Sequence, residues 1–422
     1  MQVLFTMFFV LLLIGIPIPA ALGLSLYQNA IFGEGASIDF IGRTMIRSMD
    51  SFPILAVPVF ILAGEIMGKG GISKRLFDFA NSIIGRVTGG VPMATVLTCM
   101  LFGAISGSGP ATFAAVGAIM IPLMVKQGYN KPFVTGLSAT AGGLGVIIPP
   151  SLPMVMFAIA ANQSIGDMFL AGIIPGVIFG VALMIYAFIY SKINKIPPCP
   201  EDMRPQPVLV SVRKGFFALL TPVIILGGIY SGYVTATEAA AVSVVYGIIV
   251  SVFVYKTIKF KDLPKMVYNA ALTCGPILLI VAIATVFGRA ITFEGIPRMV
   301  ASALMGVSTN PVVILIILNI LLLIVGMFMD TLSAIVILAP MLLPIAAAIG
   351  VSPIHFGVIM VANLAIGLVT PPIGISLYVA SAITRLSIMK ISKAVIGPIV
   401  AMLVALILVT AVPVLSTFIV NL

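Results

Sequence analysis

Two proline pairs lie inside apolar stretches, in GLGVIIPPS (Gly143–Ser151) and IGLVTPPIG (Ile366–Gly374). The proline pairs are 222 residues apart, and the same spacing recurs elsewhere in the chain without a gap. It relates three more pairs of positions: Pro122 and Pro344, Gly128 and Gly350, and Gly145 and Gly367. So many matches in one register are hard to obtain by chance. The sequence therefore predicts a chain built from two repeats.

The composition identifies the class of protein. Of 422 residues, 61% are hydrophobic and only 8% are charged, and the mean hydropathy is +1.27. A soluble domain carries about 25% charged residues, so a globular soluble protein is excluded, as are a disordered chain and a coiled coil. The apolar runs are continuous and long enough for helices. We expect an all-α polytopic membrane protein in a lipid bilayer.

The positive charges gather in short clusters, which explains the net charge of +10 without a nucleic-acid partner. The cluster Lys192–Lys214 is also rich in proline, and we interpret residues 192–214 as a cytoplasmic linker. It divides the chain into a first repeat, residues 1–191, and a second, residues 215–422. Counting apolar segments outward from this linker puts equivalent segments on opposite faces, which predicts inverted-topology repeats. The first 32 residues are compatible with one long helix or with two short ones.

Each repeat contains a pair of short apolar segments joined by an uncharged or nearly uncharged turn. The first pair covers about 91–125 around SGSGPATF (Ser106–Phe113), and the second covers about 311–345 around MFMDTLSA (Met327–Ala334). Segments of about 15 residues reach roughly 22 Å, less than the hydrocarbon core of roughly 30 Å. Ordinary spans with a surface turn are one interpretation. We favour two re-entrant hairpins, since a surface turn normally carries charge.

The proline pairs interrupt two longer apolar runs, about 132–161 and 353–383. Proline has no backbone donor and clashes with the preceding turn, so each run is predicted to be a broken helix. A kink that serves only packing is the simpler alternative. Broken helices also free carbonyl groups, and a sodium ion held by carbonyl and hydroxyl oxygens satisfies them. The candidate ligands are Ser106, Ser108, Gly145, Ile148 and Pro149 in the first repeat, and Gly326, Asp330, Thr331, Gly367, Thr370 and Pro371 in the second.

Asp330 is the one acid placed deep in a predicted hairpin. Acids inside membranes usually serve function, so a cation or proton role and a structural cap for the following amides are equally compatible with its position. No catalytic motif surrounds Ser106 or Ser108, because neither has the glycine spacing of a serine nucleophile. An intramembrane hydrolase using one of these serines remains a third hypothesis, and we expect a transporter rather than an enzyme.

These motifs resemble a known family. SGSGPATFAAVGAIMIPLM, GGLGVIIPPS, GMFMDTLSAIVILAPMLLPIA and NLAIGLVTPPIG are similar to the large membrane subunit of tripartite ATP-independent periplasmic (TRAP) transporters, of the ion-transporter superfamily. The resemblance implies a permease subunit in the bacterial inner membrane that works by an elevator motion. It also implies sodium-driven import of an organic acid, such as a C4-dicarboxylate or sialic acid.

The resemblance further implies two protein partners, a small four-helix membrane subunit and a soluble periplasmic binding protein that delivers the organic anion. It places the family's sodium sites on the hairpin tips and helix breaks, at the ligands given above except Thr331. The alternative is a self-contained sodium/dicarboxylate symporter of the same superfamily.

Overall fold

The computed structural model describes residues 2–32, 37–196, 205–295, 299–300, 302, 306, 308 and 310–421. In these residues every regular element is a helix, and nine helices are long and apolar enough to cross a membrane. The count becomes ten if one bent helix pair is taken as a single span. The prediction of an all-α polytopic membrane protein is confirmed.

The N-terminal part forms separate short helices rather than one long one. Gly15 has a positive φ of 88° and Pro17 lacks a backbone donor, so the first helix stops before them and a second begins after them. The helices of this part are α1 (Gln2–Leu13), α2 (Ile18–Phe32), α3 (Ile38–Met49), α4 (Ala56–Lys69) and α5 (Ile72–Ile84).

The first hairpin and the first broken helix follow directly. The hairpin arms are α6 (Gly90–Ser106) and α7 (Gly109–Lys126). The broken helix consists of α8 (Lys131–Gly142), α9 (Leu144–Ile147) and α10 (Leu152–Ala160), with a 41° bend at the proline pair. The long helix α11 (Ile165–Ile193) completes this half.

The second half begins with three helices, α12 (Val208–Tyr230), α13 (Ala236–Ile248), which continues as a π-helical turn over Ile249–Val254, and α14 (Leu263–Phe293). The second hairpin consists of α16 (Pro311–Phe328) and α17 (Thr331–Ala348), and the second broken helix of α18 (Pro353–Gly367) and α19 (Ile375–Thr384). The chain ends with α20 (Ile388–Ala411) and α21 (Val414–Thr417).

The two halves share their element boundaries. Helix α7 and helix α17 both begin and end 222 residues apart, which is the spacing of the proline pairs. The N-cap residues of these helices, Ser108 and Asp330, are separated by the same number. The repeat seen in the sequence is thus also a repeat of local structure.

Both ends of the predicted linker, residues 192–214, are helical. Helix α11 extends to Ile193 and α12 already begins at Val208, while residues 197–204 of the predicted linker lie outside the described residues. Arg213 and Lys214 therefore belong to a helix, although their charge suggested a segment outside the membrane. Long basic side chains can extend from a helix toward water, and the Lys214 ammonium donates a hydrogen bond to Gln206 Oε1 at 3.0 Å.

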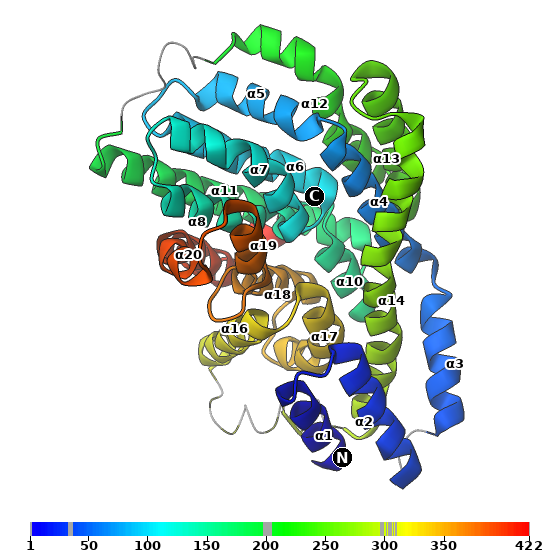
Figure 1. The fold of residues 1–422 in the computed structure, drawn as a ribbon. Coiled ribbons are helices and arrows are strands. Elements are labelled where there is room, and N and C mark those ends of the chain that lie inside the picture. Colours follow the sequence, from blue (N-terminus) through cyan, green and yellow to red (C-terminus); the bar gives the residue numbers. More distant parts are fainter. Residues whose placement is uncertain are drawn as a thin grey trace.

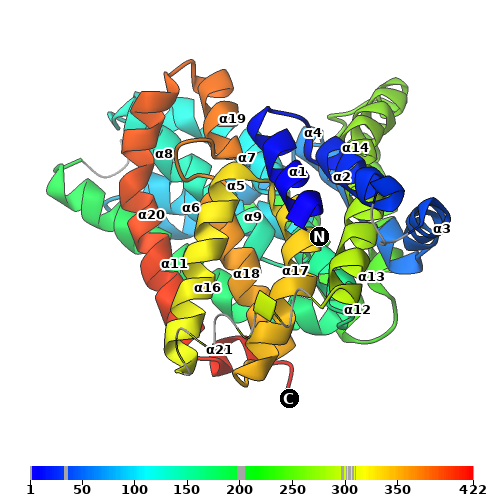
Figure 2. The same cartoon turned by 90° about the horizontal axis from the view of Figure 1, so that it is seen from below.

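Figure 1 shows α5 and α12 on one side of the molecule and α1, α2 and α3 on the other, with α14 running along the edge between them. In the view turned by 90°, α16, α18 and α20 lie next to one another (Figure 2). Helix α14 has 31 residues, or about 46 Å. It thus exceeds the thickness of a hydrocarbon core and contacts both ends of the fold.

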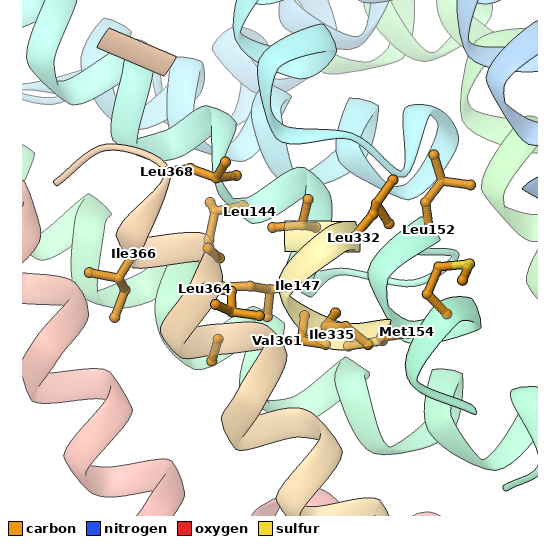
Figure 3. Close-up of a cluster of buried hydrophobic side chains, with 14 of the residues drawn as sticks. Leu144, Ile147, Leu152, Met154, Leu332, Ile335, Val361, Leu364, Ile366 and Leu368 are labelled. Carbon is orange, nitrogen blue, oxygen red and sulfur yellow. The ribbon is translucent and has the colours of Figure 1, made fainter. Parts of the chain in front are cut away.

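The buried core lies where the two breaks and the second hairpin meet. Figure 3 shows Leu144 and Ile147 of α9 packed near Leu332 and Ile335 of α17 and Leu364 of α18. All five side chains are buried, with exposed fractions between 0% and 9%. Apolar packing of this kind holds the two breaks close together.

Candidate functional site

The tip of the first hairpin gathers hydroxyl groups next to the first helix break. The hydroxyls of Ser106 and Thr112 are hydrogen bonded at 2.6 Å, and Ser106 Oγ also donates to the carbonyl oxygen of Ser108 at 3.3 Å. Gly145 faces this group so closely that a Cβ on it would lie 2.3 Å from Thr112 Oγ1 and 2.8 Å from the Ser108 oxygen. The structure therefore brings Ser106, Ser108 and Gly145 together, as the sequence predicted.

The tip of the second hairpin is organised around Asp330. Its Oδ1 accepts hydrogen bonds from the amides of Leu332 at 2.9 Å and Ser333 at 3.2 Å, and its other oxygen accepts from the Ser333 hydroxyl. The structural cap considered for this residue is thus present. Thr331, the next residue, is buried. A cation role for either residue stays a prediction.

The second tip also touches the second break through two glycines. A Cβ on Gly367 would lie 2.4 Å from the carbonyl carbon of Gly326, and one on Gly326 would lie 3.1 Å from the Gly367 Cα. Any side chain at Gly367 would separate the hairpin from the broken helix. The sequence placed both glycines in one site, and the structure places them in contact.

Backbone hydrogen bonds tie each tip to the helix segment after the proline pair. Leu152 N donates to Gly107 O at 3.2 Å in the first half, and Gly374 N donates to Met327 O at 3.3 Å in the second. At the breaks themselves, two consecutive carbonyls in each half accept no hydrogen bond from the described residues. They belong to Ile148 and Pro149 in the first half and to Thr370 and Pro371 in the second, again 222 residues apart.

The chemistry of these groups fits a hard monovalent cation. Every candidate ligand atom is an oxygen from a carbonyl, a hydroxyl or the one carboxylate. Unwound backbone carbonyls are the usual sodium ligands in transporters with broken helices. The Thr370 hydroxyl donates to Ile366 O at 2.7 Å, which leaves its lone pairs available to a cation. The two breaks therefore offer two sites of similar composition.

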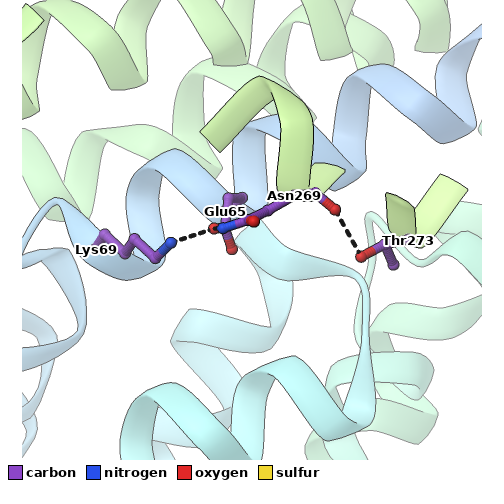
Figure 4. Close-up of polar contacts among 4 residues, drawn as sticks. All are labelled: Glu65, Lys69, Asn269 and Thr273. Atoms are coloured by element: carbon purple, nitrogen blue, oxygen red, sulfur yellow. Dashed lines mark hydrogen bonds and ion pairs between the residues drawn. The ribbon is translucent and has the colours of Figure 1, made fainter. Parts of the chain in front are cut away.

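A cavity of about 380 Å³ opens beside the first tip, a size typical of small-molecule pockets. Ser106, Ser108 and Leu332 form one wall, and helices α4 and α14 form the other. Figure 4 shows four polar residues that α4 and α14 contribute to this wall. Glu65 Oε1 accepts hydrogen bonds from the Lys69 ammonium and from Asn269 Nδ2, the second at 3.0 Å. A third hydrogen bond runs from Thr273 Oγ1 to Asn269 O at 3.0 Å.

Three of the residues at this site escaped the sequence analysis. Thr112 lies one helical turn past the SGSG turn. The helical repeat of 3.6 residues could therefore have placed its side chain at the tip. Glu65 is an acid inside an apolar run, with Lys69 four residues later, a spacing typical of helical ion pairs. Asn269 carries no local signal, because it meets Glu65 across 204 residues of chain.

Comparison with known proteins finds a protein family that this chain matches along nearly its whole length. The sequence model described as "Tripartite ATP-independent periplasmic transporter, DctM component" matches residues 5–415. The isethionate TRAP transporter permease protein DctMQ of Oleidesulfovibrio alaskensis is 44% identical over 99% of this chain. The chain spans 66% of the length of that relative.

Two further relatives match along nearly their whole length. The C4-dicarboxylate TRAP transporter large permease protein DctM of Pseudomonas aeruginosa is 41% identical over 94% of this chain and 92% of its own. The sialic acid TRAP transporter large permease protein SiaM of Vibrio cholerae is 36% identical over 96% of this chain and 94% of its own length.

A solved structure shows the same fold at low sequence identity. The YdaH transporter of Alcanivorax borkumensis, described as having an unusual topology, superposes with a TM-score of 0.65 and covers 97% of both chains. Its sequence identity is 13%, so this likeness concerns the fold alone.

Proposed function

Because the chain belongs to the family of TRAP transporter large permease subunits, we propose that it imports a small organic anion driven by a sodium gradient. The family itself establishes a transporter subunit of the bacterial inner membrane rather than an enzyme. An intramembrane hydrolase built on Ser106 or Ser108 is thereby set aside.

The proposal of sodium coupling rests on one observation, the four carbonyls at the helix breaks without a hydrogen-bond donor. Three of the four residues are only partly buried, so each carbonyl without a partner costs less than one fully removed from water. A sodium ion at each break would supply these carbonyls with a partner, and its loss would release the tip from the break. We place one ion near Ser106, Ser108, Gly145, Ile148 and Pro149, and a second near Gly326, Asp330, Thr331, Gly367, Thr370 and Pro371.

The cavity of about 380 Å³ is the proposed substrate chamber. It lies directly on the hydroxyl-rich tip of the first hairpin, so sodium and substrate would be held by the same loop. Three relatives are named for isethionate, C4-dicarboxylates and sialic acid. These compounds share a small size and a negative charge, and we propose an organic acid of this class as the substrate.

The proposed motion follows from the position of the chamber between two sets of helices. The hairpins and broken helices would move as one body against α4, α13 and α14 in an elevator motion. A small four-helix membrane subunit would hold the static helices in place. A periplasmic binding protein would deliver the anion.

Reconstituted uptake tests the proposal. Proteoliposomes are prepared with this chain alone, with this chain and a cognate small subunit, and with both plus the cognate binding protein. Uptake of radiolabelled succinate, sialic acid and isethionate is measured with an inward gradient of sodium or of potassium. We expect uptake of one compound only with all three proteins and with sodium. Uptake without the binding protein would support a self-contained symporter, and equal uptake in potassium would refute sodium coupling.

A further inference from the structure

A second cavity lies farther along the same helices. It measures about 440 Å³ and is enclosed by α3 and the segment after it, α10, α14 and α17. Helices α10, α14 and α17 also line the first cavity. The two cavities therefore follow one seam of the molecule, on which α14 contributes Thr273 to the first and Thr285 to the second.

Along the shared helices, the lining residues of the two cavities come within one helical turn of each other. On each shared helix, a residue of the first cavity and a residue of the second are separated by four positions, or about 6 Å. All six residues are apolar: Leu152 and Met156, Ile277 and Val281, and Leu332 and Val336. An anion in one cavity thus meets a thin hydrophobic plug rather than a thick protein wall.

The two cavities differ in charge. In the first, the cation of Lys69 is paired with the carboxylate of Glu65. Among the described residues, the second is lined by two guanidinium groups, those of Arg47 and Arg289, and by no carboxylate. Neither arginine forms an ion pair or a hydrogen bond with the described part of the chain. Both arginines are exposed, and two unpaired cations at the mouth of a cavity raise the local concentration of anions.

A simpler explanation exists for each arginine alone. Arg47 lies in the last turn of α3, and Arg289 lies near the C-terminal end of α14. The helix dipole stabilises a cation at the C-terminal end of a helix. That explanation does not require both side chains to line one cavity. Arg43 is the contrasting residue, because it lies one turn earlier on α3, pairs with Asp39 at 2.9 Å and does not line the cavity.

We propose that the second cavity is an additional binding site for a small organic anion, with Arg47 and Arg289 as the groups that bind its carboxylate or sulfonate. The site holds the anion on the face opposite the basic cluster Lys256–Lys265, before it crosses the plug into the first cavity. This inference rests on the proposed function in one respect, that the transported solute is an anion.

The chain contains no tryptophan, which allows a direct test in the full chain. Phe293 lines the second cavity, and F293W places the only tryptophan of the chain there, which can be excited at about 295 nm without exciting the ten tyrosines. Its quenching by iodide, an anion, is compared with its quenching by neutral acrylamide, which corrects for accessibility. We expect R47Q/R289Q in the F293W background to lower the iodide-to-acrylamide ratio by about threefold. R43Q in the same background should leave the ratio unchanged.

Competition then identifies the kind of anion. Succinate, isethionate and sialic acid are added separately to F293W protein in a non-ionic detergent, and protection against iodide is expected from at least one of them. The same titration in phosphatidylcholine nanodiscs, with and without phosphatidylglycerol, separates a soluble anion from a lipid headgroup. An equal iodide ratio in R47Q/R289Q and in its parent would overturn the proposal. Protection by phosphatidylglycerol alone would also overturn it.

Uptake by the complete transporter separates this inference from the proposed function. R47Q/R289Q is expected to raise the substrate concentration for half-maximal uptake severalfold and to leave the sodium concentration for half-maximal uptake unchanged. A wild-type transporter that ignores sodium would contradict the proposed function and leave the iodide result standing. A variant with the wild-type substrate dependence would contradict a role of the second site in uptake.

Discussion

Replacing Gly367 by alanine tests whether contact between the second hairpin and the second helix break holds the proposed sodium site together. The added methyl group would lie 2.4, 2.5 and 2.6 Å from the carbonyl carbon, Cα and carbonyl oxygen of Gly326. All three are backbone atoms, so no side chain can rotate away. Carbon atoms in contact are about 3.5–4.0 Å apart, and α16 would have to move away by about 1 Å.

The size of the effect follows from this overlap. Overpacking of a core costs about 1–3 kcal/mol, and we expect G367A to lose this much stability. The carbonyls of Thr370 and Pro371 follow Gly367 within four residues and would shift with it. If about 1.4 kcal/mol of the cost falls on sodium binding, the sodium concentration for half-maximal uptake rises about tenfold.

Two control variants test whether the effect depends on how close the added methyl group comes to other atoms. G326A puts its methyl group 3.1 Å from the Gly367 Cα and should be milder, whereas G275A on α14 has no atom within 4 Å and should behave as wild type. Thermal midpoints in detergent, with sodium or potassium chloride, and sodium titrations of uptake are measured for all three. We expect the loss of stability and of sodium affinity to decrease in the order G367A, G326A, G275A. Equal midpoints and equal sodium dependence for G367A and G275A would refute it.

Three further predictions concern polar groups. T112V removes the hydroxyl that is hydrogen bonded to Ser106 and should raise the sodium concentration needed for uptake. T112S keeps a hydroxyl and should have the sodium dependence of wild type. Identical sodium titrations for both variants would exclude Thr112 from the site. D330N keeps one oxygen for the cap of α17, so this variant should keep the thermal midpoint of wild type and lose the sodium sensitivity of uptake. D330A should lose the sodium sensitivity and also about 0.5–2 kcal/mol of stability. A D330N sodium titration that matches wild type would leave Asp330 as a cap alone. Burial raises the pKa of Asp78 on α5, which is not among the candidate spans, although Lys74, Lys214 and Arg75 oppose the shift. The folded state then binds this proton more tightly than the unfolded state, so the ionised carboxylate destabilises the fold above the folded pKa. D78N should raise the thermal midpoint at pH 8, and the gain should shrink as the pH is lowered; a constant gain would contradict this assignment.

The local elements of the fold were largely readable from the chain. The uncharged SGSGP turn and the two proline pairs predicted hairpins and broken helices, and α6, α7, α16 and α17 have boundaries within a few residues of those expected. Proline and glycine act on their own neighbours, so their positions suffice to locate a break. The helical start at Val208, inside the predicted linker, was not readable, because basic residues on a helix look the same in sequence as basic residues beyond its end.

The site was readable only in part, for a physical reason. The carbonyls of Ile148, Pro149, Thr370 and Pro371 are left free by proline chemistry, which the sequence carries locally. The wall formed by Glu65 and Asn269 depends on two helices that meet across 204 residues, and no local pattern encodes that meeting.

The sequence by itself thus determined a duplicated membrane protein with uncharged breaks, because composition and proline spacing act through solvation and backbone sterics. Only the tertiary structure decided which helices line the seam. It placed two cavities one helical turn apart on α10, α14 and α17, with a paired cation in one and the guanidinium groups of Arg47 and Arg289 in the other. Such an arrangement depends on the packing of distant helices against one another, and packing is a property of the folded chain as a whole.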